Sequence, residues 1–277
     1  MPPERTAVRP ERTSLRRKLA IATWRAPHEG RLHARMAVDA TAALAHCVRL
    51  RAQTGVPVSV GALVGLAFSR AVQEVPAFSH RVVFGRLVPF RSLDVAFAVD
   101  IDGGDDLAPT KVCDVDGKDL VQVSRELAEG AARLRSRQDR AHGTARGLTR
   151  WLPWFVLRPA LMMASLLNGG VGVRFLGQPA HPLGSLFVTN IGSFGLDEGY
   201  VAPVPLARVP LYVCVGAVSD APMVVDGEVV ARPQLVLTAT ADHRIVDGAH
   251  AAKLARIVRR YLAEPQLLDP PGAVAQA

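Results

Sequence analysis

A histidine and an aspartate four residues apart, His243 and Asp247, are the side chains best placed for chemistry. They lie in the stretch 241–248, Ala-Asp-His-Arg-Ile-Val-Asp-Gly. Before it, residues 235–239 have the pattern of a strand, and after it residues 254–262 repeat apolar side chains at helical spacing. A rigid strand-to-helix junction can present polar side chains. Histidine is the side chain most readily poised as a base near neutral pH, and a nearby carboxylate can fix its loop or tautomer.

Taken alone, His243 would be interpreted as an ordinary turn histidine. Its context favours a function, because Asp-His-Arg-x-x-Asp-Gly after a strand resembles the active-site signature of dihydrolipoyl acyltransferases. These enzymes are the core component of 2-oxoacid dehydrogenase complexes and share a fold with chloramphenicol acetyltransferase. The resemblance implies an α/β fold, a two-layer sandwich in which helices flank a mixed β-sheet. It also implies that His243 is the general base and that Asp247 holds the loop that carries it.

A second segment carries the same resemblance. Residues 185–189 are predicted to form a strand, and Asn-Ile-Gly-Ser-Phe-Gly follows at 190–195. The segment resembles the family's Ser-Asn-(apolar)-Gly-x-Phe-Gly motif, with Thr189 at the serine position. The resemblance makes the Thr189 hydroxyl the donor to the developing oxyanion, while Asn190 supports the turn. The extra methyl group of threonine changes the room for the acyl group, and an ordinary strand threonine is the structural alternative.

The remaining site candidates hold the histidine loop rather than react. In the family an early arginine lies near the active-site aspartate. The run Arg-Arg-Lys near the N-terminus makes Arg17 the candidate partner of Asp247 and Arg16 its alternative, against a solvated helix face. Asp242 and Arg244 belong to the histidine motif and are assigned structural roles.

Hydrophobic periodicity predicts strands and helices along the rest of the chain. The dipeptide Asp226-Gly227 predicts a hairpin turn. A strand that ends in Ala98-Val99, a turn with Gly103-Gly104 and then Pro109 loosely resemble the corresponding segment of the family. The expected elements are helices at about 14–24, 40–53, 60–74 and 119–138, strands at about 32–38, 94–101, 185–189 and 211–217, and hairpins at 81–88 and 224–230.

The resemblance covers residues 13–268, one catalytic domain between a flexible arm at 1–12 and a flexible tail at 269–277. It is interrupted at about 139–183, where family members pass directly to the next strand. The apolar run 151–167 inside this insertion contains prolines and is too short to span a bilayer comfortably. A buried or subunit-packing helix is the favoured interpretation. A flap over a substrate channel, or a helix lying on a membrane surface, comes second.

Composition limits the remaining classes of function. With 277 residues, 49% of them hydrophobic, the chain can bury a full core. The net charge is +8, but no recognition helix, zinc finger or aromatic-basic pattern accompanies the basic clusters, so nucleic-acid binding is only a weak alternative. Three cysteines without a Cys-x-x-Cys pair argue against disulfides and zinc. The arginine-rich N-terminus lacks a signal-peptide pattern, which favours the cytoplasm.

The resemblance implies a coenzyme A-dependent acyltransferase, and no metal is expected. The acyl group would pass between a thioester and a thiol, amine or hydroxyl acceptor, with acyl-coenzyme A as substrate. No lysine has a lipoyl-domain context, so no covalently bound lipoyl group is expected. The resemblance implies a homotrimer in which the histidine of one subunit faces the hydroxyl of its neighbour, and it leaves a higher assembly of trimers open.

Two other functions stay open. One is a catalytically inactive trimeric scaffold that retains the acyltransferase fold, which a coenzyme A binding measurement would distinguish. The other is a membrane-surface acyltransferase or binding module that uses residues 151–167. Co-sedimentation with liposomes, with and without that segment, would distinguish it.

Overall fold

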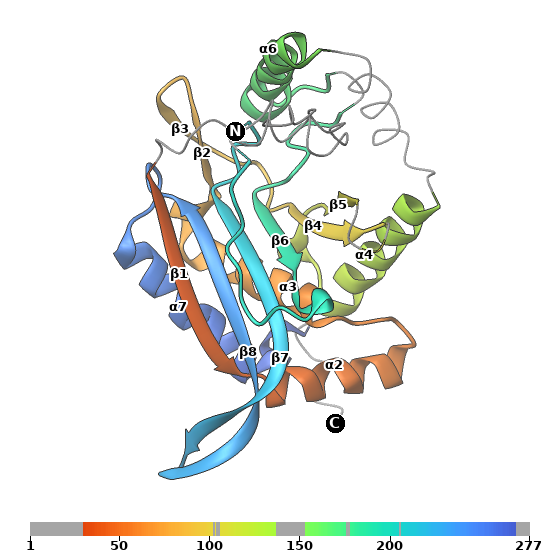
Figure 1. The fold of residues 1–277 in the computed structure, drawn as a ribbon, viewed down its shortest axis with the longest axis vertical. Coiled ribbons are helices and arrows are strands. Elements are labelled where there is room, and N and C mark those ends of the chain that lie inside the picture. Colours follow the sequence, from red (N-terminus) through yellow and green to blue (C-terminus); the bar gives the residue numbers. More distant parts are fainter. Residues whose placement is uncertain are drawn as a thin grey trace, which may run out of the picture.

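A six-stranded mixed β-sheet forms the centre of the fold (Figure 1). The computed structural model describes residues 30–101, 103, 106–136, 153–175, 178–204 and 206–269. Neighbouring strands follow the order β1-β8-β7-β6-β4-β5, and β2 pairs with β3 in a separate hairpin. The strands are β1 (Arg31–Asp39), β2 (His80–Val83), β3 (Arg86–Pro89), β4 (Val95–Asp100), β5 (Leu107–Val112), β6 (Leu186–Asn190), β7 (Leu211–Val225) and β8 (Glu228–Asp242).

Strand direction decides where each loop emerges from the sheet. β6 runs parallel to both of its neighbours, β4 and β7, whereas the other pairs in this sheet are antiparallel. Ala241, near the end of β8, pairs with Leu211 at the start of β7, and Leu211 pairs with Leu186 at the start of β6. The loop after β8 and the loop after β6 therefore lie at opposite ends of the sheet.

β7 and β8 form one long hairpin that reaches beyond the rest of the sheet, at the bottom of Figure 1. Its turn, Asp226-Gly227, has φ angles of 52° and 87°, the left-handed conformation that a two-residue hairpin turn requires. The predicted turn is confirmed. The segments expected at 211–217 and 224–230 are parts of two continuous 15-residue strands rather than separate elements.

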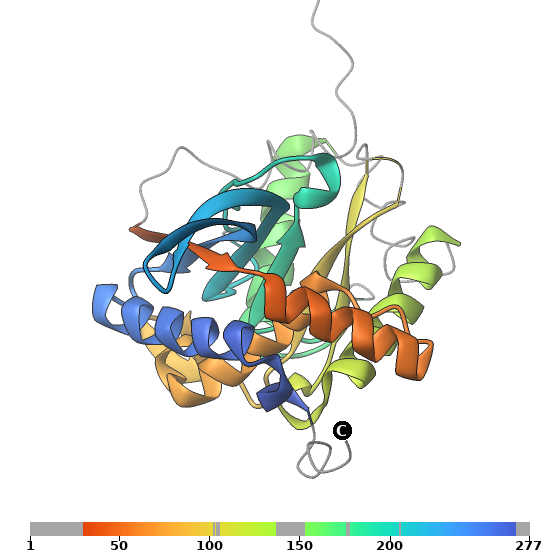
Figure 2. The same cartoon turned by 90° about the horizontal axis from the view of Figure 1, so that it is seen from below.

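Helices α2, α3, α4 and α7 cover one face of the sheet, as Figures 1 and 2 show together. Side chains alternate along each strand, so Leu186 and Val188 of β6 join the core with the helices. This two-layer arrangement of a mixed sheet and helices confirms the predicted fold class. The helices are α2 (Thr41–Thr54), α3 (Val60–Glu74), α4 (Leu120–Arg135), α6 (Trp154–Ala164) and α7 (Gly248–Ala263).

The helices predicted at 40–53, 60–74 and 119–138 are confirmed over the described residues, and caps explain two of their starts. The Ser59 side chain accepts a main-chain hydrogen bond in the first turn of α3. Asp119 forms a reciprocal capping box at the start of α4. Nearly the whole length of α3 is buried, which matches its apolar sequence.

Strand β5 is not among the elements predicted from the sequence. Residues 107–112 form β5, which pairs with β4 in antiparallel register and lies at the edge of the sheet. An edge strand has a neighbour on one side only, so it tolerates a residue that lacks an N–H group. Proline and the preceding glycines conceal this strand from a pattern-based prediction.

The face of the sheet opposite the helices is covered by residues 191–204, which run in front of β7 and β8 in Figure 1. The ring of Tyr200 packs edge-on against His33, with 5.4 Å between ring centroids. The Thr238 hydroxyl donates to a main-chain carbonyl of this segment. An ion pair of 2.6 Å joins Arg35 to Glu198. The segment is therefore fixed to β1 and β8.

Residues 1–29, 137–152 and 270–277 lie outside the described residues, and so do the predicted arm at 1–12 and the helix expected at 14–24. The described part of the predicted insertion contains α6 followed by a π-helical turn, Ser165–Val171. Across the described ranges, no helix is long and apolar enough to cross a membrane.

Candidate active site

The loop 243–247 joins the end of β8 to the start of α7. Asp242 holds this turn, because its carbonyl accepts hydrogen bonds from the N–H groups of Ile245 and Val246. Its carboxylate accepts from the N–H group and the guanidinium of Arg244, the closest contact being 2.6 Å. Asp242 and Arg244, to which the sequence assigns structural roles, are thus bound to each other inside the turn.

His243 presents an exposed side chain on this loop. Its Nδ1 lies 2.8 Å from the main-chain oxygen of Val246. A carbonyl can only accept a hydrogen bond, so Nδ1 carries the proton and Nε2 of the neutral ring holds the lone pair. The N–H group of His243 donates to the carbonyl of Gly30 at 3.3 Å, which ties the loop to the start of β1.

Asp247 caps helix α7. Its Oδ1 accepts hydrogen bonds from the N–H groups of Ala249 and His250, and it lies 2.9 Å from Nδ1 of His250. The main-chain hydrogen bond from His250 contributes most to lowering the pKa of the Asp247 carboxyl. A negative charge is favourable at the N-terminus of a helix. The predicted partners of Asp247, Arg17 and Arg16, lie outside the described residues.

Thr189 and Asn190 end strand β6 at the other end of the sheet. Thr189 is half-buried, and because its neighbour Val188 is in the core, the Thr189 side chain is on the face opposite the helices. The Asn190 side-chain oxygen accepts from the N–H group of Gly192 at 3.0 Å. The Asn190 carbonyl accepts from the Ser193 hydroxyl at 3.0 Å. Asn190 thus holds the turn that follows Thr189.

One chain does not bring His243 and Thr189 together. In the sheet register Thr189 lies opposite Cys214, and Cys214 lies opposite Thr238. Asp242, the residue before His243, is farther along β8 by about 13 Å and two strands away by about 10 Å, at the usual rise and strand spacing. This separation far exceeds a hydrogen bond. The two residues can act on one substrate only when they come from different subunits.

A small polar pocket of about 30 Å³ adjoins the histidine loop. Arg31 from the start of β1, Arg208 from the segment before β7, and Asp242 and Arg244 beside His243 contribute to its lining. Sequence reasoning missed this pocket because three segments far apart in the chain form it. The clustering of Arg31, Arg208 and Arg244 near His243 becomes visible only in the folded structure.

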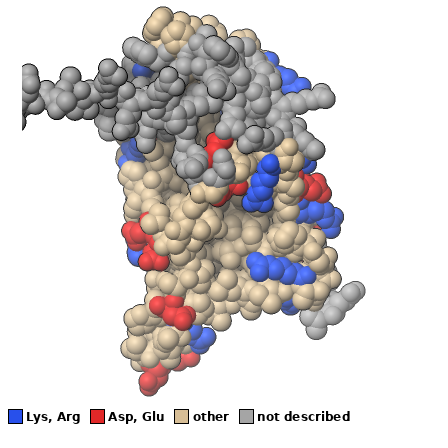
Figure 3. Space-filling model, turned by 45° about the vertical axis from the view of Figure 1, so that its right-hand side comes forward, with Lys and Arg blue, Asp and Glu red and all other residues tan. Residues whose placement is uncertain are grey.

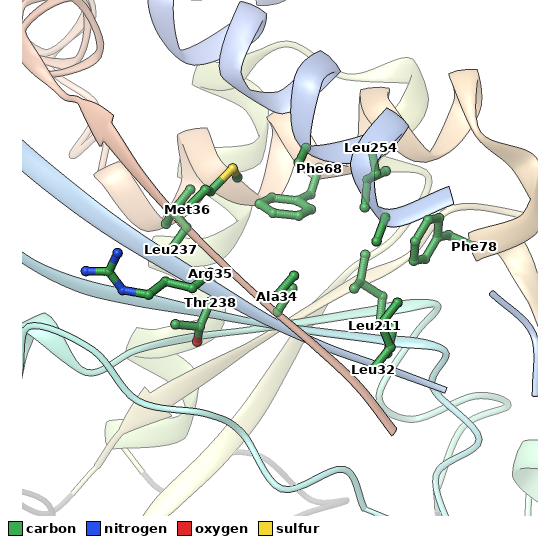
Figure 4. A pocket seen from close by; sticks show the side chains of 14 residues that line it. Leu32, Ala34, Arg35, Met36, Phe68, Phe78, Leu211, Leu237, Thr238 and Leu254 are labelled. Carbon is green, nitrogen blue, oxygen red and sulfur yellow. The ribbon is translucent and has the colours of Figure 1, made fainter. Parts of the chain in front are cut away.

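A larger cavity of about 40 Å³ lies between the sheet and helices α3 and α7 (Figure 4). Figure 4 shows apolar side chains, such as Phe68 and Leu254, turned toward it, whereas Arg35 and Thr238 point away. Most of its lining belongs to the hydrophobic core. The cavity is therefore a gap in core packing rather than a catalytic site.

Acidic and basic side chains are interspersed on the face of the molecule in Figure 3, rather than gathered into one basic patch. Within the described ranges, no group of three or more histidine, cysteine, aspartate or glutamate side chains is arranged to hold a metal ion. On the described part of the chain, the candidates for a catalytic role are therefore the loop that carries His243 and the end of β6 that carries Thr189.

A family model described as 2-oxoacid dehydrogenases acyltransferase (catalytic domain) matches residues 2–147 and 182–269. The match includes both motif segments and every strand of the central sheet. Residues 148–181, which contain α6, are not matched and fall inside the predicted insertion.

Two curated relatives show the same likeness in sequence. The dihydrolipoyllysine-residue acetyltransferase component of the pyruvate dehydrogenase complex from Mycoplasma capricolum is 40% identical over 81 residues, 29% of this chain. The probable succinyltransferase component of the mitochondrial 2-oxoglutarate dehydrogenase complex from Schizosaccharomyces pombe is 36% identical over 84 residues, 30% of this chain. The aligned segment spans 18% of each relative's length. These matches therefore cover only a small part of the relatives.

Two solved structures share the fold. A probable dihydrolipoamide acetyltransferase from Listeria monocytogenes gives a TM-score of 0.67 at 16% identity, covering 93% of this chain and 95% of that one. The cubic core of a pyruvate dehydrogenase multienzyme complex gives 0.64 at 21% identity, covering 92% and 87%. The predicted chloramphenicol acetyltransferase-like fold, which the resemblance assigned to such acyltransferases, is thereby confirmed.

Proposed function

Because the chain belongs to the family of 2-oxoacid dehydrogenase acyltransferase catalytic domains, we propose that it moves an acyl group between a coenzyme A thioester and a thiol, amine or hydroxyl acceptor. The observation that carries this proposal is the His243 ring, whose Nδ1 is held by a main-chain oxygen at 2.8 Å. This contact directs the basic lone pair to Nε2, on an exposed side chain in the family motif.

In the proposed reaction, Nε2 of His243 takes the proton of the acceptor as the acceptor attacks the thioester carbonyl carbon. The carbonyl oxygen becomes an oxyanion and accepts a hydrogen bond from the Thr189 hydroxyl. When the intermediate collapses, the carbon–sulfur bond breaks and His243 returns the proton to the leaving thiolate of coenzyme A. A general base contributes about 10²–10⁴-fold to such a reaction, and one oxyanion donor about 10²–10³-fold.

Thr189 acts in a neighbouring subunit in this proposal. The register of the sheet supports the arrangement, because one chain holds His243 and Thr189 at opposite ends of its sheet. A homotrimer supplies each site with both residues. A relative in the fold comparison forms a cubic core, which supports a further assembly of trimers. The cytoplasm stays the predicted location.

The variant His243→Gln tests the proposed base, with acetyl-coenzyme A and dihydrolipoamide as first probes. We expect kcat to fall by about 10²–10⁴-fold, with the oligomer unchanged in size-exclusion chromatography. His80→Gln is the matched control, because Nδ1 of His80 also contacts a carbonyl, that of Pro76 at 2.9 Å. It should keep wild-type activity. Full turnover by His243→Gln, or an equal loss in the control, would refute the mechanism.

A further inference from the structure

The arginine-lined pocket adjoins the loop of the proposed base. Its lining includes Arg31 at the start of β1, Arg208 ahead of β7, and Arg244 immediately after His243. The carbonyl of Gly30, another lining residue, accepts the main-chain hydrogen bond of His243 at 3.3 Å. A chemical group bound in this pocket would therefore lie against the histidine loop.

In the part of the chain that the structure describes, three arginines but only one carboxylate, that of Asp242, line the pocket. Asp242 lies opposite Arg31 in the strand register. Its carboxylate oxygens, however, accept hydrogen bonds of 2.6 to 3.1 Å from the guanidinium of Arg244. Among the described residues, no carboxylate forms an ion pair with Arg31 or Arg208. The pocket thus keeps a net positive charge.

Arg208 is held in a strained and half-buried position. Its φ angle of 56° lies in the left-handed region, which an arginine rarely adopts, and such strain is concentrated at functional sites. Its Nη1 donates to the carbonyl of Val82 at 2.6 Å, whereas its buried Nε has no hydrogen-bond partner on the described part of the chain. Burial, and then the nearby Arg244, lower the pKa of the guanidinium.

A second guanidinium lies behind Arg208. Arg81 is 7% exposed and donates to the carbonyls of Pro89 and Gly170. A Cβ atom added at Gly170 would lie 3.7 Å from Nε of Arg208, so Arg81 and Arg208 both lie next to this glycine. Nε of Arg81 also has no hydrogen-bond partner within the described ranges. Buried charges that lack a counterion are costly to the fold, and a bound anion offsets that cost.

We propose that this pocket binds a negatively charged group, a carboxylate or a phosphate, of the acyl group or acceptor that reacts at His243. The inference rests on the proposed acyl transfer and adds the charge of the substrate to it. The planar guanidinium groups of Arg208 and Arg31 match both oxyanions. The phosphates of coenzyme A are not the source, because the pantetheine arm separates them from the thioester.

Binding of an anion can be measured without turnover, by titrating the full chain with succinate and with inorganic phosphate in a calorimeter. We expect saturable binding that weakens about 10- to 100-fold in Arg208→Gln and less in Arg208→Lys, which keeps the charge but loses the planar fork. Arg31→Gln should weaken binding as well, and it leaves the contact of Arg208 with Val82 in place. The control Arg133→Gln removes an exposed charge on α4, at the far edge of the sheet, and should bind as the wild type does.

Pairs of substrates that differ in one negative charge show whether the bound anionic group belongs to the acyl group or to the acceptor. If it belongs to the acyl group, Arg208→Gln lowers the ratio of kcat/KM for succinyl- over acetyl-coenzyme A about 10-fold or more. If it belongs to the acceptor, the same variant lowers the ratio for dihydrolipoate over dihydrolipoamide. The proposal is overturned when neither anion binds the wild type, or when Arg208→Gln changes neither binding nor either ratio. A chain that binds these anions but transfers no acyl group would refute the proposed function alone.

Discussion

At the scale of single residues, the sequence finds what is close in the chain and misses what is close only in space. The His243 ring is oriented by the carbonyl of Val246, and the Asp242–Arg244 contact holds the same turn, so one motif predicts the group. The hydrogen bond from the His243 N–H group to Gly30 comes from a distant segment. Arg208 lies against the same loop, yet it is 35 positions away in the sequence. Its left-handed backbone and lack of a counterion appear only in the folded chain.

Asp247 allows a residue-scale test of how the loop is held. Asp247→Ala removes the cap of α7 and should lower the free energy of unfolding by about 0.5–2 kcal/mol in chemical denaturation. Asp247→Ser keeps a good capping side chain without the charge. We therefore expect it to restore both stability and kcat to near the wild-type values. A serine variant that is stable but inactive would show that the carboxylate itself is needed, as pairing with Arg17 or Arg16 would require.

At the scale of elements, the sequence predicts those that have a clear apolar period and misses those that break one. Helix α7 follows directly from its spacing of apolar residues, and the core strand β6 from its short run of apolar, aromatic and β-branched residues. Edge strand β5 contains Pro109, and a proline argues against a strand in a pattern-based prediction, because the one-sided pairing that tolerates it is a tertiary feature. Nothing in the amino-acid sequence predicts that the turn Ser165–Val171 is π-helical.

The packing of α4 on the unpredicted strand β5 can be tested at Gly130. A Cβ atom at this position would overlap the hydroxyl of Thr110. Helix propensity alone favours Gly130→Ala by up to about 1 kcal/mol, but overpacking costs about 1–3 kcal/mol. We expect a net loss of stability in thermal unfolding, which Thr110→Ala should partly reverse in the double variant. Glu129→Ala, on the exposed side of α4, is the control; a more stable Gly130→Ala protein would contradict this packing.

At the scale of the whole molecule, the direction of the strands places the two halves of the proposed site, His243 and Thr189, far apart in one chain. Because β8 is antiparallel to β7 and β6 is parallel to it, the loop after β8 and the turn after β6 leave the sheet at opposite ends. No local rearrangement of the loops covers that distance without breaking the sheet. A complete site of the proposed kind is therefore a property of the oligomer.

A mixed oligomer tests this division directly. His243→Gln and Thr189→Val, which removes the hydroxyl but keeps a β-branched side chain, should each be nearly inactive alone. In a trimer that contains both variants, one interface joins an intact His243 to an intact Thr189, so about one site in three recovers. We expect mixed trimers, isolated through a different affinity tag on each variant, to regain that share of the wild-type kcat. Mixed trimers as inactive as the single variants would show that the two side chains do not meet across a subunit boundary.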